Sequence, residues 1–366
     1  MRFLIILIGV LSGLAACQTA ADQLLQRAVE EQQQGNFSAA IADYKKVLQL
    51  RPATVEAKVN MGAALAHVGR YDEAISAYRS ALPSLRDKNP VILNLGLAYY
   101  KKGDFENASR QFAILRKAQP EDVRVAILLG DSYVRQGKAE SAMSVLEPLA
   151  SANAGNLDFQ FVYGSALINS GRRREGVSLV EQVAAANNSP DAYRLAGATL
   201  LQMNDAEAAL RDLEEALRLD PTLPGIYTLV GTARDKNSDA AHAELAFREA
   251  LKINPDDFDA NLYLGTILYK RRENDEAKIY LDRALRLNPS QSLARYESAM
   301  LKSATGQYEA ALGELEKLAK DEPNWLEPHV ELATLYYRLH RPADGARERA
   351  TVERITAEQQ AKVPGK

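Results

Sequence analysis

The residue types that could do chemistry are few and scattered in this 366-residue chain. There is one cysteine, which excludes an intramolecular disulfide, and there are four histidines. These are His67, His242, His329 and His340. One cysteine and histidines at unrelated positions argue against a zinc site. The chain has no glycine-rich phosphate loop, no His-Glu-x-x-His and no Gly-x-Ser-x-Gly motif, so we predict a protein without catalysis, metal or cofactor.

Charge and length exclude further classes of protein. Lys and Arg number 45 and Asp and Glu 48, giving a formal net charge of −3. The chain therefore lacks the basic footprint of a nucleic-acid-binding protein. Hydrophobic residues make up 46% and charged residues 25%, as in folded soluble proteins. Because single cores stop growing at roughly 250–300 residues, the length predicts either several domains or an open, repetitive architecture.

The first residues have the pattern of an export signal. Arg2 is followed by an apolar stretch, 3–14, which is shorter than the roughly 20 apolar residues that cross a membrane. The stretch ends in Leu14-Ala15-Ala16-Cys17. This ending resembles the bacterial lipobox, in which the cysteine sulfur receives a diacylglycerol and becomes the mature N-terminus. An ordinary signal peptide with an incidental Cys17 is the alternative.

The lipobox resemblance implies a cellular location for the protein. It divides the N-terminus into a signal peptide over 1–16 and a lipid tether over 17–20, with acyl chains such as palmitate attached at Cys17. Gln18 follows the cysteine, where aspartate would favour retention in the inner membrane. We therefore predict a protein of the cell envelope, anchored by lipid to the outer membrane and facing the periplasm.

Small residues recur at intervals of 34 along the rest of the chain. The first series is Ala28, Gly62, Gly96, Gly130, Gly164, Gly197, Gly231, Gly265, Ala299 and Ala333. A second series of small residues and a series of prolines keep the same register, including its single 33-residue step. Three residue classes that share one period and one deletion indicate an internal repeat.

Each period predicts a pair of helices. It holds two amphipathic stretches of about 12–14 residues, joined by a turn that often reads Gly-x-aromatic. Glycine there suits a left-handed residue at a helix end, and a proline near the end of the period stops the second helix. The small residues let the two helices approach, and a larger residue such as Tyr78 or Phe247 fills the gap. One pair cannot bury its apolar face alone, so neighbouring pairs must stack.

This pattern of small, aromatic, alanine and proline positions resembles the tetratricopeptide repeat family, most closely over 95–105 and 284–289. The resemblance covers nearly the whole mature chain. It implies an all-α fold, a right-handed superhelical α-solenoid of about ten helix–turn–helix repeats over 21–359, with a C-terminal tail over 360–366. We place the repeats at 21–54, 55–88, 89–122, 123–156, 157–189, 190–223, 224–257, 258–291, 292–325 and 326–359.

The resemblance also implies a binding surface, because the first helix of each repeat lines a concave groove in this family. The groove uses the second, fifth, ninth, twelfth and thirteenth places of a repeat. The candidate partner-groove residues are Val59, Leu93, Tyr100, Lys101, Ile127, Arg135, Phe161, Tyr269, Lys270, Tyr296, Trp325, Tyr337 and Arg338. Polar residues, Arg194 and Thr228, interrupt this series in repeats six and seven.

Two interpretations of these groove residues stay open. A tyrosine beside a cation, as in Tyr269-Lys270, could hold an extended peptide or its carboxylates. Such pairs are also common in the family and could belong to the scaffold alone. Trp325, at the last turn between repeats, is expected to pack between them, with a partner contact as the alternative.

The sequence therefore predicts a non-enzymatic scaffold that binds a protein or peptide and no nucleic acid. Secretion, pilus or envelope assembly is the expected setting, since a lipobox followed by repeats is similar to the layout of lipoproteins that assist secretins and of Tad-type pilus lipoproteins. One alternative is an accessory subunit of a polysaccharide or glycosyl-transfer system, which should show a continuous acidic or aromatic stripe. The other is a homo-oligomeric structural protein. Partner identity and oligomeric state stay undetermined.

Overall fold

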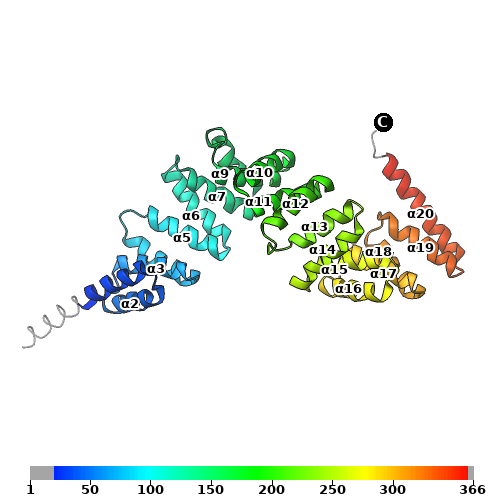
Figure 1. The fold of residues 1–366 in the computed structure, drawn as a ribbon, viewed down its shortest axis with the longest axis horizontal. Coiled ribbons are helices and arrows are strands. Elements are labelled where there is room, and N and C mark those ends of the chain that lie inside the picture. Colours follow the sequence, from blue (N-terminus) through cyan, green and yellow to red (C-terminus); the bar gives the residue numbers. More distant parts are fainter. Residues whose placement is uncertain (1–19, 362–366) are drawn as a thin grey trace, which may run out of the picture. The chain divides into compact units, whose positions relative to one another are not determined.

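The computed structural model describes residues 20–361, and every regular element in that range is helical (Figure 1). The predicted signal peptide, Cys17 and the last residues of the tail lie outside the described residues. The chain divides into two compact halves, which we call the N-terminal half, ending at Ala186, and the C-terminal half, beginning at Asn187. Between 20 and 361, no helix is both long enough and apolar enough to cross a bilayer.

The N-terminal half begins with a helix over 20–33. The helices that follow are α2 (Phe37–Leu50), α3 (Val55–His67), α4 (Tyr71–Ala81), α5 (Asn89–Lys102), α6 (Phe105–Ala118), α7 (Val123–Arg135), α8 (Ala139–Leu146), α9 (Leu157–Asn169) and α10 (Arg173–Asn187). Short 3₁₀ turns, η1 (Leu82–Ser84), η2 (Glu147–Leu149) and η3 (Ser151–Asn153), extend α4 and α8. Successive helices pack on one another, as α3 does on α4 and α4 on α5.

The C-terminal half repeats this arrangement. Its helices are α11 (Pro190–Gln202), α12 (Ala206–Leu219), α13 (Ile226–Lys236), α14 (Ala240–Ile253), α15 (Phe258–Lys270), α16 (Asn274–Leu287), α17 (Ser292–Ala304), α18 (Tyr308–Asp321), α19 (Leu326–Arg338) and α20 (Pro342–Ala361). First helices of neighbouring repeats also touch, as α13 touches α15 and α15 touches α17. The predicted all-α stack of helix pairs is confirmed.

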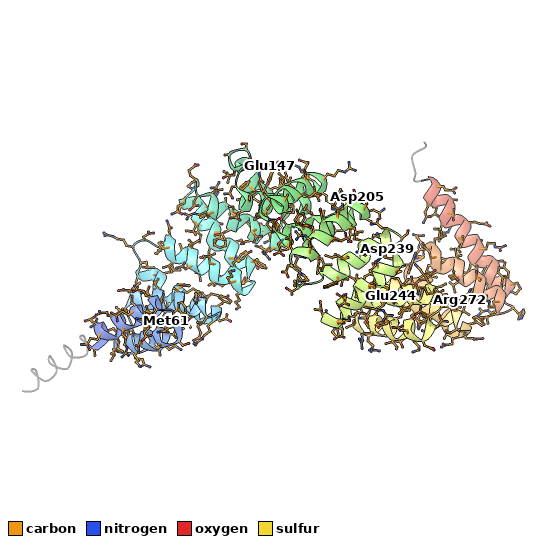
Figure 2. All side chains as sticks on the ribbon, in the orientation of Figure 1. Met61, Glu147, Asp205, Asp239, Glu244 and Arg272 are labelled. Carbon is orange, nitrogen blue, oxygen red and sulfur yellow. The ribbon has the colours of Figure 1, made fainter. Side chains whose placement is uncertain are left out.

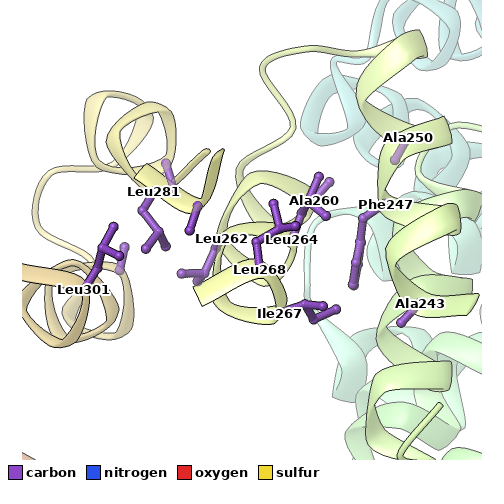
Figure 3. Packing of buried hydrophobic residues seen from close by; sticks show 13 residues of the cluster. Ala243, Phe247, Ala250, Ala260, Leu262, Leu264, Ile267, Leu268, Leu281 and Leu301 are labelled. Atoms are coloured by element: carbon purple, nitrogen blue, oxygen red, sulfur yellow. The ribbon is translucent and has the colours of Figure 1, made fainter. Parts of the chain in front are cut away.

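In the core of a repeat, a small residue on the first helix faces a large side chain on the second helix. Gly96 of α5 faces Phe112 of α6, and a Cβ atom at Gly96 would come 2.6 Å from the ring. Gly231 of α13 faces Phe247 of α14 at the same 2.6 Å. Both rings are 0% exposed, and Figure 3 shows Phe247 among the aliphatic residues of α14 and α15. The predicted pairing of a small residue with a large one is thus confirmed in both halves.

The turn inside each repeat places one residue in the left-handed region. In the N-terminal half this residue is always glycine, for example Gly69 (φ 76°) and Gly103 (φ 85°). In the C-terminal half most of the same positions carry a side chain, at Asn204, Ser238, Arg272 and His340. Where the next residue is an aspartate, its carboxylate caps the second helix, as Asp205 does for α12 and Asp239 for α14. Figure 2 labels both residues. The turn without glycine at Ser238 therefore keeps the family geometry at some cost in backbone strain.

Candidate partner-binding site

The first helices of the repeats form what we call the first-helix face of each half. In the N-terminal half this face is built by α3, α5, α7 and α9. The predicted groove residues at its fifth places are half-buried and pack against the local cores; they are Val59, Leu93, Ile127 and Phe161. Leu93, Leu97 and Leu128 line a cavity of about 390 Å³ in this region. The face of this half is therefore mainly apolar.

Two charged groups of the N-terminal face, Asp131 and Arg135, are paired within the fold. The Tyr100 hydroxyl donates to the Asp131 carboxylate, and Arg135 Nε donates to Asp131 Oδ2 at 2.9 Å. The Arg135 guanidinium also lies 5.4 Å from the ring centroids of Tyr100 and Phe105. Burial, with help from Asp131, raises the pKa of Tyr100 to about 12. These contacts occupy Tyr100 and Arg135 within the scaffold, while Lys101 beside them is exposed.

The polar interruption predicted in repeats six and seven is also paired within the protein. Thr228 is 8% exposed, and its hydroxyl donates to Asp257 Oδ2 at 2.8 Å. Arg194 Nη2 lies 3.5 Å from Asp191 Oδ1. Both polar side chains therefore have partners supplied by the fold.

Several predicted residues of the C-terminal face pack within the scaffold. Trp325 precedes α19, and its ring lies on Tyr296 with centroids 5.2 Å apart. Both rings pack against the core formed by α17, α18 and α19, as expected for inter-repeat packing. The Arg338 guanidinium lies 5.0 Å from the Tyr308 ring centroid, and Tyr337 is 40% exposed. Lys270 is exposed at the end of α15.

A set of carboxylates on the first helices of the C-terminal half was not predicted from the sequence. They are Asp259 on α15, Glu297 on α17 and Glu331 on α19. Burial raises the pKa of all three, although the Lys270 charge opposes the rise at Glu297 and the Arg338 charge opposes it at Glu331. Among residues 20–361, no hydrogen bond or ion pair reaches any of the three carboxylates.

Two tyrosines, Tyr269 and Tyr296, are affected by the charges of Glu297 and Glu331. Burial raises the pKa of Tyr269, and the charges of Glu297 and Glu331 raise it further. Burial also raises the pKa of Tyr296, with further contributions from Glu331 and Glu297. Glu297 and Glu331 occupy the same place in neighbouring repeats, and the Tyr296 ring on α17 lies 5.2 Å from the ring of Trp325, which precedes α19. We call Tyr269, Tyr296, Glu297 and Glu331 the acidic face.

A sequence signal for the acidic face does exist. Glu297 and Glu331 occupy the sixth place of repeats nine and ten, one period apart, and Tyr263 occupies that place in repeat eight. The sixth place is not among those that the family resemblance assigns to the groove. Within residues 20–361, no three side chains of His, Cys, Asp or Glu gather as metal ligands would.

Comparison with known families decides the fold family. The tetratricopeptide repeat family matches four segments, 25–90, 93–156, 163–224 and 231–292, which together make up more than half of the chain. The chain belongs to the tetratricopeptide repeat family. No curated protein matches it.

Solved tetratricopeptide repeat and related structures show the same fold. A tetratricopeptide repeat protein from Parabacteroides merdae is 16% identical with a TM-score of 0.57, covering 68% of this chain and 99% of that one. The structure of pilF from Pseudomonas aeruginosa is 19% identical with a TM-score of 0.51, covering 58% and 96%. The Cut9–Hcn1 hetero-tetramer of the APC/C matches at 13% identity and a TM-score of 0.54, covering 92% and 73%. At these identities the likeness concerns the fold.

Proposed function

We propose that this tetratricopeptide repeat protein is a non-enzymatic scaffold that binds a protein or peptide partner on the first-helix face of its C-terminal half. The observation that supports the proposal most is the acidic face, where Glu297 and Glu331 lack a partner within the described fold. Buried charges are normally paired, so an unpaired set on a packed surface favours binding from outside. A stack of helix pairs offers this surface already ordered, which lowers the entropic cost of binding.

We further propose that lipid on Cys17 holds the scaffold to the outer membrane, facing the periplasm, for secretion, pilus or envelope assembly. The ending Leu14-Ala15-Ala16-Cys17 and the following Gln18 support this location. A stable anchor takes more than one acyl chain, which a lipoprotein cysteine carries.

The anchor can be tested by replacing its attachment residue. Cys17→Ser is expected to abolish incorporation of labelled palmitate and to move the protein from the outer-membrane fraction to the soluble periplasmic fraction. The unmodified protein is fractionated in parallel as the control. Unchanged membrane association of the Cys17→Ser protein would contradict the proposed location.

Partner binding can be tested with a photoreactive residue at Tyr269 on the acidic face. The matched control places the same residue at Ile279, which is 58% exposed on α16, the second helix of the same repeat. Crosslinking in cells followed by mass spectrometry is expected to give one protein from position 269 and not from 279. Capture of glycan at 269 would favour the polysaccharide alternative, and identical products from both positions would contradict a specific face.

A further inference from the structure

We propose that the outer surface of α14 and α16 binds a second copy of this chain, in a two-fold symmetric pair. The surface is formed by the twenty-second, twenty-sixth and thirtieth places of repeats seven and eight. These places hold Leu245, Glu249 and Ile253 on α14 and Ile279, Arg283 and Leu287 on α16. We call these six residues the second-helix patch. The patch lies on other helices than the acidic face, so the inference does not depend on the proposed function.

The four aliphatic side chains of the patch are open to solvent. Leu245 is 60% exposed, Ile253 67%, Ile279 58% and Leu287 39%. They are four of the nine large hydrophobic side chains that are exposed among residues 20–361. Residues four and eight places apart follow one side of a helix, so each aliphatic pair and the charge between its members form one stripe. Single exposed aliphatic side chains are ordinary, whereas a group on one surface indicates an interaction site.

The two stripes lie next to each other and face away from the core. Arg248 Nη1 on α14 donates to Glu276 Oε1 on α16 at 2.8 Å, which holds the two second helices side by side. Phe247 and Leu281, two residues before the charge of each stripe, are both 0% exposed. Residues two apart point to nearly opposite sides of a helix, so the stripes point outward.

The aliphatic stripes are limited to repeats seven and eight. In repeat six the twenty-second and twenty-sixth places hold Arg211 and Glu215, and in repeat nine they hold Gly313 and Lys317. Polar and small residues therefore border the patch on both sides. An apolar centre with a polar rim is the usual composition of a protein–protein interface.

The charges at the centre of the patch favour a second copy as the occupant. Glu249 on α14 is negative and Arg283 on α16 is positive, at the same place of neighbouring repeats. When two copies meet about a two-fold axis, α14 of each lies against α16 of the other, and Glu249 of each copy faces Arg283 of the other. The surface thus carries its own complement in charge as well as in apolar side chains.

Both charges are free to pair across such an interface. Among residues 20–361, no ion pair reaches Arg283. Glu249 is bound only by Lys252, one turn along the same helix at 2.6 Å, and the Lys252 side chain is 70% exposed. Exposed pairs of this kind are weak, so Glu249 can exchange Lys252 for an arginine of the second copy.

The experiment measures self-association of the purified full chain by sedimentation equilibrium. The natural chain is expected to form a species with the mass of two chains. Glu249→Arg alone and Arg283→Glu alone place like charges opposite each other, and each should weaken self-association at least about tenfold. An equimolar mixture of the two variants recovers opposite charges at both contacts and should associate within about threefold of the natural chain.

Matched variants test the apolar part of the patch. Leu245→Ser with Ile279→Ser should weaken self-association about tenfold or more. One control is Ile114→Ser, which removes a 49% exposed aliphatic side chain from the second helix α6 of the N-terminal half. The other is Glu309→Arg on the second helix α18, and both controls should change affinity by about twofold or less. Circular dichroism checks that all the variants fold.

Four results would overturn the inference. The first is the mass of a single chain at every concentration measured, and the second is a mass above two chains, which excludes the two-fold pair. The third is a mixture of Glu249→Arg and Arg283→Glu proteins that associates no better than either alone. The fourth comes from cells, where a photoreactive residue at Ile279 should capture this chain itself, and capture of only a different protein would contradict self-association.

Discussion

The two first-helix faces stand on the same scaffold and differ in how their charges are satisfied. In the N-terminal half, Asp131 is held by Tyr100 and Arg135. In the C-terminal half, Glu297 and Glu331 are half-buried and have no such partners among the described residues. The period fixes the core places of a repeat and leaves its surface places free. The proposed binding surface therefore lies where the fold leaves charge unpaired, and the fold alone does not define it.

The largest expected loss of stability should be similar in both halves, because both pack a large ring against a small residue in the core. Phe112→Ala and Phe247→Ala each remove a ring that is 0% exposed and should lower the free energy of unfolding of the affected half by about 3–5 kcal/mol. Denaturant unfolding combined with hydrogen exchange measures each half, since repeat arrays can unfold in parts. An unchanged free energy of unfolding after either substitution would contradict the claim that both halves depend on the same core packing.

The next effect concerns a paired carboxylate of the N-terminal half. A hydrogen bond from Arg27 lowers the pKa of Asp43, so its ionised form stabilises the fold above the unfolded pKa, and this stability is lost as the pH falls. Asp43→Asn should therefore cost about 1–3 kcal/mol at pH 7. The difference from the natural protein should shrink toward acid pH in thermal unfolding, and a difference independent of pH would argue against the pairing.

Glu297 should show the opposite sign. Burial raises its pKa, so the folded state favours the protonated form and stability falls as the pH rises through the raised pKa. Glu297→Gln mimics that form and should raise the melting temperature at pH 7, with the gain disappearing at acid pH. A lower melting temperature at pH 7 would mean that the carboxylate has a counter-ion in solution and would remove the contrast between the two faces.

The smallest effect separates the turns of the two halves. Gly69→Ala forces a Cβ into a left-handed residue at φ 76° and should destabilise the N-terminal half by about 1 kcal/mol. Ser238→Gly relieves the same conformation in the C-terminal half, at φ 63°, and should stabilise it by about 0.5 kcal/mol after the entropic cost of glycine. Denaturant unfolding measures both changes. If both substitutions changed the free energy of unfolding in the same direction, the proposed difference between the two turns would be contradicted.

The fold could be predicted from the sequence because side-chain size and backbone freedom at a few repeated positions determine it. The spacing of Gly96 and Gly231 predicts close helix pairs, and Gly69 predicts a left-handed turn. Stacking is local, so each repeat can be predicted from itself and its neighbours. The turn at Ser238 keeps the geometry without glycine, because tertiary packing overrides a single residue's preference.

The candidate site was only partly predictable, because pairing and burial are properties of neighbours in space. Tyr269 and Tyr296 were identified from their places in the repeat, but Glu297 and Glu331 were not. Nothing in the local sequence shows that Asp131 forms an ion pair with Arg135 whereas Glu297 forms none in the described structure. The recurrence of glutamate one period apart was the available signal. The anchor at Cys17 lies outside the described residues and stays a prediction.

The most direct test places a photoreactive phenylalanine at the twelfth place of one repeat in each half, at Tyr100 or at Tyr269. Each protein is irradiated in cells that produce it, and the crosslinked fraction is measured by mass spectrometry. We predict a yield of crosslinked partner at position 269 at least about tenfold above that at position 100. Equal yields, or a higher yield at position 100, would contradict the assignment of partner binding to the C-terminal face.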